Sequence, residues 1–332
     1  MRQSVSVYFS SAGRRVGLIH CFREAARDLG VELRVIAGDM APDYSAACVE
    51  ADVAIRTPAC SAPEFIDVVF DNCVRHEVDL VVPTIDPELI LYSRARARFE
   101  AHHITVGVSD PQVVEIAQDK YLTAKWFSER GFATPATFDL EELSKAPQSA
   151  PWPLLLKPKA GSASKGIYVA NDWGEVRADD VAADYVAQAL LSGREFTTNI
   201  FFDHKGFLRA AVPHVRQEVR GGEVSKGETV DDPQIIAIAE RLGQQLKGAR
   251  GALCFQAIVG ADGIPSIFEI NARFGGGYPL AHRAGAPFAK WLLAESIGLE
   301  ADYAHQWQSG LRMLRYDDAH FIGTCSSITK DF

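Results

Sequence analysis

The sequence has no C-x-x-C pair and no cluster of histidine with cysteine, the patterns that indicate zinc or redox sites. No apolar run reaches the length of a membrane span, and residues 1–15 contain too short an apolar run for a signal peptide. Internal repeats and low-complexity segments are absent as well. Reduced thiols in a cytoplasm are the simplest interpretation of the six cysteines, which stand at positions 21, 48, 60, 73, 254 and 325. These absences predict a cytoplasmic globular protein that does not bind membranes.

Positive charge is scarce too. The chain has 34 Lys and Arg against 43 Asp and Glu, which gives a formal net charge of −9. This balance argues against non-specific binding to nucleic acid or to acidic membranes. The 332 residues suffice for two or three domains, and the 47% hydrophobic and 23% charged content is ordinary for a soluble enzyme. The composition therefore argues against some classes of partner and indicates none.

The first 115 residues alternate strand and helix signals, which predicts a parallel, doubly wound sheet. Its strands are expected at 5–9, 33–37, 80–82 and 105–108, and its helices at 16–29, 63–76 and 87–99. A surface connection is expected over 141–153, and one amphipathic helix over 233–247. Strands dominate the rest of the chain, and they are expected at 154–157, 167–170, 185–191, 195–202, 207–215, 253–259 and 266–271.

The segment 254–277, CFQAIVGADGIPSIFEINARFGGG, is the most informative part of the chain. Asp262-Gly263 is a strong two-residue hairpin turn between two apolar runs. A hairpin folded about this turn places Gln256 directly opposite Glu269. Side chains alternate between the two faces of a strand, so polar residues at every second position share one face.

Three side chains on that face, Gln256, Glu269 and Asn271, therefore form a cluster of oxygen ligands. Such a cluster, with few carboxylates, suits Mg²⁺ (or Mn²⁺) that takes further ligands from the phosphates of a nucleotide. Arg273 lies on the same face and would help to hold those phosphates.

Phe268 and Ile270 line the opposite face, and Cys254 is expected on the apolar face, in the core. The alternative interpretation of the hairpin is an exposed polar face without a site. The three glycines at 275–277 disfavour it. Three consecutive glycines directly after a strand are a poor way to continue or cover a sheet.

A second candidate site for an anion begins at Lys157, which ends an apolar strand and is held extended by Pro158. A lysine at the end of a buried strand needs an anionic partner. The loop that follows, KAGSASKG over 159–166, combines flexible backbone amides with hydroxyls and a cation, which suits an anion-binding lid. A plain glycine-rich turn is the alternative for the loop alone. The residues concerned are Gly161, Ser162, Ser164, Lys165 and Gly166.

The connection from Gln188 to Glu195 offers contacts for a nucleoside. Backbone amides of the apolar residues Ala189, Leu190 and Leu191 can recognise the edge of adenine, and Glu195 can accept from ribose hydroxyls. An ordinary loop is the alternative if this segment is considered by itself.

Taken in order, these motifs resemble the ATP-grasp superfamily, in the branch of single-copy proteins similar to half of a carbamoyl phosphate synthetase large subunit. The resemblance covers most of the chain. It rests on SAGRR at 11–15, DKY at 119–121, LLLKPKAGSASKGI at 154–167, QALLSGREFT at 188–197, RQEVRGGEVSKGETV at 216–230, and FQAIV with FEINARFGGG within 255–277.

The resemblance implies a mixed α/β and α+β fold of ATP-grasp architecture. Residues 1–114 are expected to form a Rossmann-like pre-ATP-grasp domain with a parallel sheet. Residues 115–190 would form a small lid subdomain with the glycine-rich loop, and residues 191–332 a C-terminal subdomain with an antiparallel sheet and the metal site.

The resemblance also implies roles for residues. ATP phosphates are expected at Lys120 and Lys157, with the loop 160–166 over the triphosphate. Arg273 is expected to steady the transferred phosphoryl group. Adenine is expected at the hinge formed by Gln188, Ala189, Leu190 and Leu191, ribose at Glu195, and Mg²⁺ at Gln256, Glu269 and Asn271.

Two positions depart from the family pattern. The hinge usually has Gln-Glu, but here it is Gln188-Ala189, which puts an acidic adenine contact in doubt. The usual proline after the asparagine is Ala272, for which little effect is expected.

Three further charged segments are candidates for substrate binding. In the family, the segment 214–229 faces the γ-phosphate and the acylating substrate, so Arg216 and Lys226 are expected to hold a substrate carboxylate or acyl phosphate. A solvated hairpin is the alternative there. At the carboxyl ends of the first-domain strands, where open α/β sheets bind ligands, Arg14 and Arg15 suit an anion while Asp86 and Glu88 suit an amine, unless they only begin helices.

The resemblance implies an ATP- and Mg-dependent ligase that activates a carboxylate as an acyl phosphate, joins it to an amine and releases ADP and phosphate. Small-molecule carboxylate and amine substrates are the expected partners. Relatives often dimerise, so a homodimer is one expected assembly. Bicarbonate or carbamate phosphorylation and a non-catalytic nucleotide-binding module are the alternatives.

Overall fold

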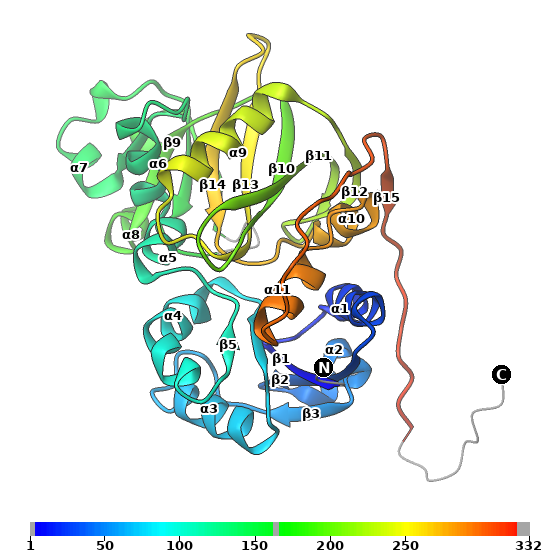
Figure 1. Ribbon diagram of the computed structural model, residues 1–332. Helices are drawn as coiled ribbons and strands as arrows, with labels where there is room; N and C mark the ends of the chain where they lie inside the picture. Colours follow the sequence, from blue (N-terminus) through cyan, green and yellow to red (C-terminus); the bar gives the residue numbers. More distant parts are fainter. Residues whose placement is uncertain (1–3, 162–165, 324–332) are drawn as a thin grey trace.

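The computed structural model describes residues 4–161 and 166–323 and contains three β-sheets (Figure 1). One is parallel and lies in the lower half of the view, and two are antiparallel and lie in the upper half. The predicted mixed fold is thus confirmed, while the boundaries after residues 114 and 190 stay predictions. Within the described ranges, no helix is both long and apolar enough to cross a bilayer.

The N-terminal sheet has five parallel strands in the order β3-β2-β1-β4-β5. The edge strand β3 was not predicted, because its four residues are too short and too exposed to give a clear signal. The strands are β1 (Ser4–Ser10), β2 (Glu32–Asp39), β3 (Val53–Arg56), β4 (Leu80–Pro83) and β5 (Thr105–Val106).

Helices cover both faces of this sheet. Val7 and Phe9 pack with α1, α2 and α11, while Tyr8 on the opposite face packs with α3 and α4. Because α11 comes from the C-terminal third, apolar packing joins the two ends of the chain. These helices are α1 (Val16–Leu29), α2 (Ala46–Glu50), α3 (Phe65–Arg75), α4 (Asp86–Glu100) and α11 (Phe288–Ser296). The helices α5 (Pro111–Gln118) and α6 (Lys120–Glu129) contact β14, and α10 (Tyr278–Ala284) contacts α1 and β12.

The large antiparallel sheet has the order β14-β13-β10-β11-β12-β15, and α9 (Pro233–Gln245) packs its buried face against β11. The edge strand β15 was not predicted, since its three residues depend on the neighbouring strand for their hydrogen bonds. The strands are β10 (Arg194–Phe202), β11 (Leu208–Arg220), β12 (Glu223–Thr229), β13 (Gly251–Val259), β14 (Pro265–Asn271) and β15 (Arg312–Leu314).

The small sheet has four antiparallel strands in the order β6-β9-β7-β8. The expected surface connection over 141–153 is wrong in part, because Leu143 of α7 and Ala150 are buried in the core of this sheet. The elements are β6 (Thr137–Asp139), α7 (Leu140–Ser144), β7 (Leu154–Pro158), β8 (Tyr168–Ala170), α8 (Ala178–Ala182) and β9 (Tyr185–Ala189).

The β13–β14 hairpin confirms the pairing of Gln256 with Glu269 but not the predicted turn. Residues 260–264 form a longer loop, and the register shifts by one residue between Gln256 and Ala257. This β-bulge leaves Phe268 as the extra residue. Because a bulge redirects side chains, Phe268 lines the same cavity as Glu269 instead of the core.

Candidate active site

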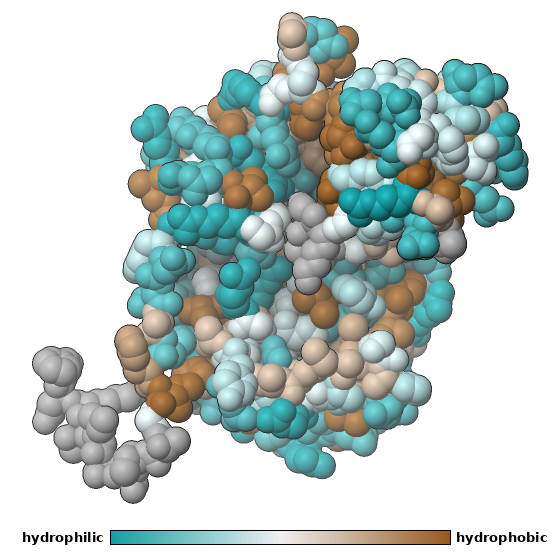
Figure 2. Space-filling view, turned by 180° about the vertical axis from the view of Figure 1, so that it is seen from behind, coloured by the Kyte–Doolittle hydropathy of each residue, from teal (hydrophilic) through white to brown (hydrophobic). Residues whose placement is uncertain are grey.

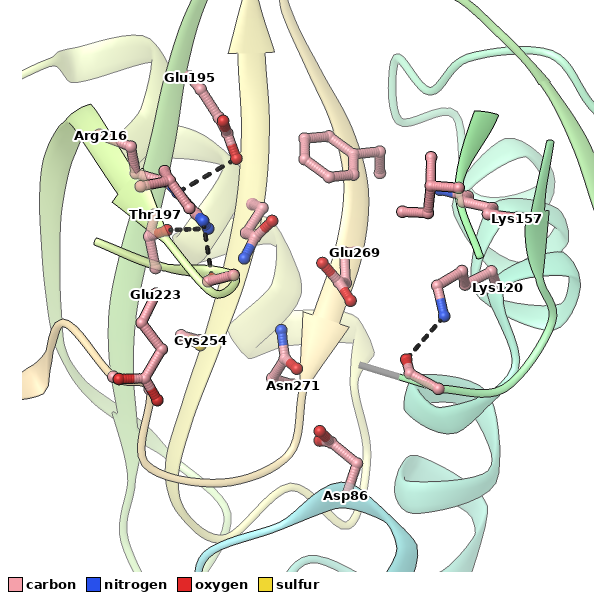
Figure 3. Close-up of a pocket in the computed structure, with 18 of the residues that line it drawn as sticks. Asp86, Lys120, Lys157, Glu195, Thr197, Arg216, Glu223, Cys254, Glu269 and Asn271 are labelled. Atoms are coloured by element: carbon pink, nitrogen blue, oxygen red, sulfur yellow. Dashed lines mark hydrogen bonds and ion pairs between the residues drawn. The ribbon is translucent and has the colours of Figure 1, made fainter. Parts of the chain in front are cut away.

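A cavity of about 510 Å³ lies where the three sheets approach one another. Its lining comes from the N-terminal domain, the small sheet and the large antiparallel sheet. Figure 2 shows a hollow lined by apolar side chains between the two lobes of the upper half. Figure 3 shows the labelled charged residues from β10 to β14 pointing into this space, with Lys120 and Lys157 across from them.

Glu269 and Asn271 lie side by side in the cavity on β14, and Gln256 faces them from β13. The amide orientation of Gln256 that satisfies both neighbours lets Nε2 donate to Glu269 Oε2 (3.0 Å) while the oxygen accepts from Arg216 Nη1 (2.6 Å). The amide nitrogen of Gln256 therefore positions the Glu269 carboxylate, while the amide oxygen of Gln256 points to Arg216. Asn271 Oδ1 accepts from Arg273 Nη2 at 3.2 Å.

These oxygen atoms fit a divalent cation that takes the rest of its ligands from the phosphates of a nucleotide. Within the described ranges, no three His, Cys, Asp or Glu side chains gather as a metal site. The oxygens at hand belong to one carboxylate, Glu269, and to amides, so most of the negative charge has to come from phosphates.

Two lysines face this oxygen cluster. Lys157 is only 4% exposed, and its Nζ donates to Gln188 Oε1 at 2.7 Å. Burial lowers the pKa of Lys157 to about 8, although the Glu269 carboxylate opposes the shift. Lys120 Nζ donates to the carbonyl oxygen of Gly161 at 3.0 Å, at the start of the glycine-rich loop. Both cations thus line the cavity beside Glu269.

The glycine-rich loop is only partly described. Gly161 lines the cavity, whereas Ser162, Ser164 and Lys165 lie outside the described residues. Gly166 does not line the cavity. It adopts a left-handed φ of 73°, and a Cβ there would lie 2.5 Å from the hydroxyl of Tyr185.

The predicted adenine hinge also lines the cavity. Gln188 is buried and donates through Nε2 to Thr137 Oγ1 at 2.7 Å, so its side chain is committed to the protein. The amide of Ala189 donates to the carbonyl of Ala136, which leaves Leu190 and Leu191 beyond the strand end as the backbone that can meet a base.

Arg216 occupies the cavity on β11, with a side chain only 7% exposed. Its Nε lies 3.2 Å from Glu195 Oε1, and its Nη2 donates to the carbonyl of Gly222 at 2.9 Å. Burial raises the pKa of Glu195, and Arg216 opposes that rise. In this arrangement, the expected ribose carboxylate is engaged by an arginine.

The other predicted residue of this hairpin, Lys226, does not reach the cavity. Arg216 pairs with Gly227 across the strands, so Lys226, one residue away, points to the opposite face. Its half-exposed ammonium lies 2.6 Å from Glu218. The structure gives no support to a catalytic role for Lys226.

Of the four candidate residues in the first domain, Glu88 and Arg14 do not line the cavity, whereas Arg15 and Asp86 do. Glu88 is fully buried and accepts from the hydroxyls of Ser10 and Ser11 and from the amide of Thr84. It therefore fixes the loops at the strand ends and cannot meet an amine. Arg14 is exposed and does not line the cavity.

Arg15 and Asp86 do line the cavity, together with Glu223 and Arg273. Arg15 Nη1 lies 2.9 Å from Glu223, and Arg273 Nη2 lies 2.7 Å from Asp86. Burial opposes the charge of Arg273, but the Asp86 carboxylate outweighs it and raises the pKa of that arginine. We call these four residues the inner end of the cavity. Sequence reasoning missed Glu223, and its position after Gly221-Gly222 in a charged hairpin was the only signal.

Three consecutive glycines line the cavity at this end, where an added side-chain carbon would press on neighbouring side chains. An added Cβ would lie 2.9 Å from Cys254 Sγ at Gly275, and 2.6 Å from Glu223 at Gly276. At Gly277 it would lie 2.6 Å from the buried imidazole of His214. Cys254, expected on the apolar face, lies instead on the cavity face two residues from Gln256, as strand alternation requires.

Comparisons with known proteins place this geometry in a family. A PylC-like N-terminal domain matches residues 7–107 and an ATP-grasp domain matches residues 117–277. A search of curated proteins gave no match to the sequence.

Solved structures share the fold at low sequence identity. The biotin carboxylase domain of Hydrogenobacter thermophilus 2-oxoglutarate carboxylase has a TM-score of 0.70 at 15% identity, over 90% of this chain and 71% of that one. N5-carboxyaminoimidazole synthetase of Staphylococcus aureus gives 0.70 at 12%, over 92% and 81%. An L-amino acid ligase of Bacillus licheniformis gives 0.66 at 18%, over 89% and 75%. The chain belongs to the ATP-grasp family and carries a PylC-like N-terminal domain before its ATP-grasp domain.

Proposed function

We propose that the protein is an ATP- and Mg-dependent ligase that converts a carboxylate to an acyl phosphate and joins it to an amine, releasing ADP and phosphate. The observation that carries the proposal is the convergence of Lys120, Lys157 and Arg273 on Glu269 and Asn271 in one cavity. Cations around an oxygen cluster are what phosphoryl transfer needs, since positioning and charge neutralisation supply most of its catalysis.

The nucleotide would lie between the small and the large antiparallel sheets. Leu190 and Leu191 offer backbone and apolar contacts to the base, and Lys157 and Lys120 offer charge to the phosphates. The H. thermophilus domain was solved with MgADP, ADP and bicarbonate, which supports a nucleotide in the matching place of the fold.

Glu269 and Asn271 would hold the magnesium ion, with Gln256 positioning the Glu269 carboxylate. When bound, the ion neutralises phosphate oxygens and draws charge from the phosphoryl group. No carboxylate other than Glu269 lines this part of the β13–β14 hairpin, so its loss should remove most of that support.

The substrate carboxylate would attack the γ-phosphorus beside Arg273, whose guanidinium is held by Asp86 across the domain interface. The amine then attacks the acyl carbon and phosphate leaves, which yields the amide. Arg216 stands at the same cavity wall and can hold a carboxylate or acyl phosphate oxygen. Enclosure by the small sheet would keep water from hydrolysing the acyl phosphate.

The test is release of ADP and phosphate from Mg·ATP in the presence of pools of acids and amines. We expect turnover only when both an acid and an amine are present, and a new amide in the product by mass spectrometry. Release that requires bicarbonate alone, or nucleotide binding without turnover across broad pools, would contradict the proposal. A homodimer is proposed as the assembly, supported only by the dimer named for the H. thermophilus domain.

A further inference from the structure

The inner end of the cavity holds more charge than the proposed ligase chemistry uses. Figure 3 shows Glu195 at one end of the cavity and Asp86 with Glu223 at the other. Arg273 and Asp86 serve the phosphoryl group in the scheme above. Arg15 and Glu223 line the same end without a role.

Glu223 holds two guanidinium groups at once. Its Oε1 lies 2.9 Å from Arg15 Nη1, and its Oε2 lies 2.9 Å from Arg315 Nη1. Arg315 belongs to the segment after β15, and it also donates to the carbonyl of Gly276, so it fixes Glu223 from outside the cavity. Burial opposes the charged form of Glu223, but Arg15 and Arg315 keep the pKa of that carboxyl below its usual value.

Guanidinium groups outnumber their directly paired carboxylates at this end. In the part of the chain that the structure describes, Arg15, Arg273 and Arg315 form ion pairs with two carboxylates, those of Asp86 and Glu223, and Glu269 adds a weaker attraction to Arg273. Burial lowers the pKa of Arg15, and nearby Arg273 and Arg315 lower it further against the pull of the Glu223 and Asp86 carboxylates. One more negative group would therefore be favourable there.

Such a group can bind Arg15 without leaving a buried charge unpaired. If Arg15 turned to a ligand carboxylate, Glu223 would keep its contact with Arg315. Breaking a buried ion pair is costly mainly because it strands one partner, and here neither partner is stranded.

The loop before α1 holds Arg15 ready. Ser11 adopts a left-handed φ of 48°, and its hydroxyl donates to Glu88 while its carbonyl accepts from Thr84. Arg15 Nη2 in turn donates to the carbonyl of Thr84 at 3.3 Å. Strained backbone fixed by surrounding contacts is typical of binding sites, and it reduces the entropy lost when a ligand binds.

We propose that Arg15 binds a carboxylate of the substrate that does not react. Glu223 is its exchangeable partner, and Arg315 is the residue that positions Glu223. This inference rests on the proposed ligase function and specifies the class of substrate. Either the amine is an amino acid that keeps its carboxylate, or the acid is a dicarboxylate of which one group is activated.

The experiment compares substrates with and without the spare carboxylate. Wild-type protein is given Mg·ATP with amino acids and, in parallel, with the matching decarboxylated amines. A second arm pairs dicarboxylic acids with their monomethyl esters. We expect the amine or the ester to react at least about tenfold more slowly in one arm, which identifies the source of the carboxylate.

The same comparison is then made with Arg15→Gln, and with Arg14→Gln as a matched exposed control. Arg15→Gln should raise KM for the carboxylate-bearing substrate by about 10- to 100-fold, leave KM for ATP unchanged and abolish the preference over the ester or amine. Arg14→Gln should behave as the wild type. Equal rates with and without the carboxylate, or a preference retained in Arg15→Gln, would overturn the inference.

If no pool gives turnover, the ligase proposal fails, and calorimetry with glutarate and L-glutamate in the presence of MgADP decides the inference separately. Binding of either one that is weakened at least about tenfold by Arg15→Gln supports the carboxylate site. Absence of binding, or binding unchanged in Arg15→Gln, rejects it. Unfolding temperatures of all variants show whether a loss reflects the site or the fold.

Discussion

The two ends of the cavity are built in opposite ways. The nucleotide end, with Lys157, Gln256 and Glu269, comes from strands paired inside two sheets, and its partners follow from short-range register. The inner end joins residues from the loop before α1, the start of α4, the start of β12 and the segment after β14, and Arg315 of the C-terminal segment contacts it from outside the cavity. Strand pairing forms each half of the first, and the two sheets then have to meet, whereas the contacts of the second exist only when the domains dock.

The nucleotide end should break most completely at Glu269. Replacing it by glutamine removes the carboxylate that acts on Lys157 and lies beside Asn271, while its partly exposed position spares the core. We expect ADP release to fall by about a thousandfold or more with an unchanged unfolding temperature. The exposed Glu240→Gln variant is the control. Near-wild-type turnover in Glu269→Gln would contradict the magnesium assignment.

Nucleotide binding at Lys157 should depend on pH. Burial lowers its pKa to about 8, so the amine of Lys157 is mostly protonated and positively charged below that pH and mostly neutral above it. Because phosphates bind the charged form, affinity for MgADP should fall by about tenfold from about pH 7 to about pH 9.

Lys157→Met should bind MgADP about 10- to 100-fold more weakly at neutral pH and lose most of this pH dependence, as measured by calorimetry. Lys145→Met, at an exposed position, should keep the wild-type profile. An unchanged slope in Lys157→Met would assign the titration to another group.

Beside the inner end, an added methyl group should lower the stability of the fold. Gly277→Ala pushes a methyl group against the buried imidazole of His214, which burial keeps neutral by lowering its pKa to about 3. We expect the free energy of unfolding to drop by about 1–3 kcal/mol in thermal or denaturant unfolding. Gly17→Ala on α1 meets only Pro279 at an ordinary 3.5 Å and should be neutral or stabilising. Equal stability of the two variants would remove the packing explanation of the three glycines.

The smallest effect is expected at Lys226. Its contact with Glu218 lies at the surface, so Lys226→Met should change kcat/KM for the acid less than about twofold. Arg216→Met removes a buried guanidinium that contacts Glu195 and Gly222, and should raise KM for the acid by about 10- to 100-fold. Steady-state kinetics of the two variants will show whether only the cavity face of this hairpin, which carries Arg216, contributes to binding of the acid.

Particular residues show how far sequence reasoning reached. The opposition of Gln256 and Glu269 was predicted and is confirmed, although the loop is longer than the predicted turn and a bulge compensates. The same bulge brings Phe268 into the cavity, which no alternation pattern could show. Lys226 was assigned by motif alone, and a register shift in β11 near Glu218 was not visible in the sequence.

By itself, the sequence determined the fold class, the order of the motifs and the pairing at the metal hairpin, because each depends on periodicity and on turns between neighbouring segments. Only the tertiary structure decided that Arg15, Glu223 and Arg315 meet, since residues that far apart in the chain share no local hydrogen-bond pattern. Apolar packing of α11 on the first domain helps to bring these charges together, and their mutual neutralisation is possible only in that docked arrangement.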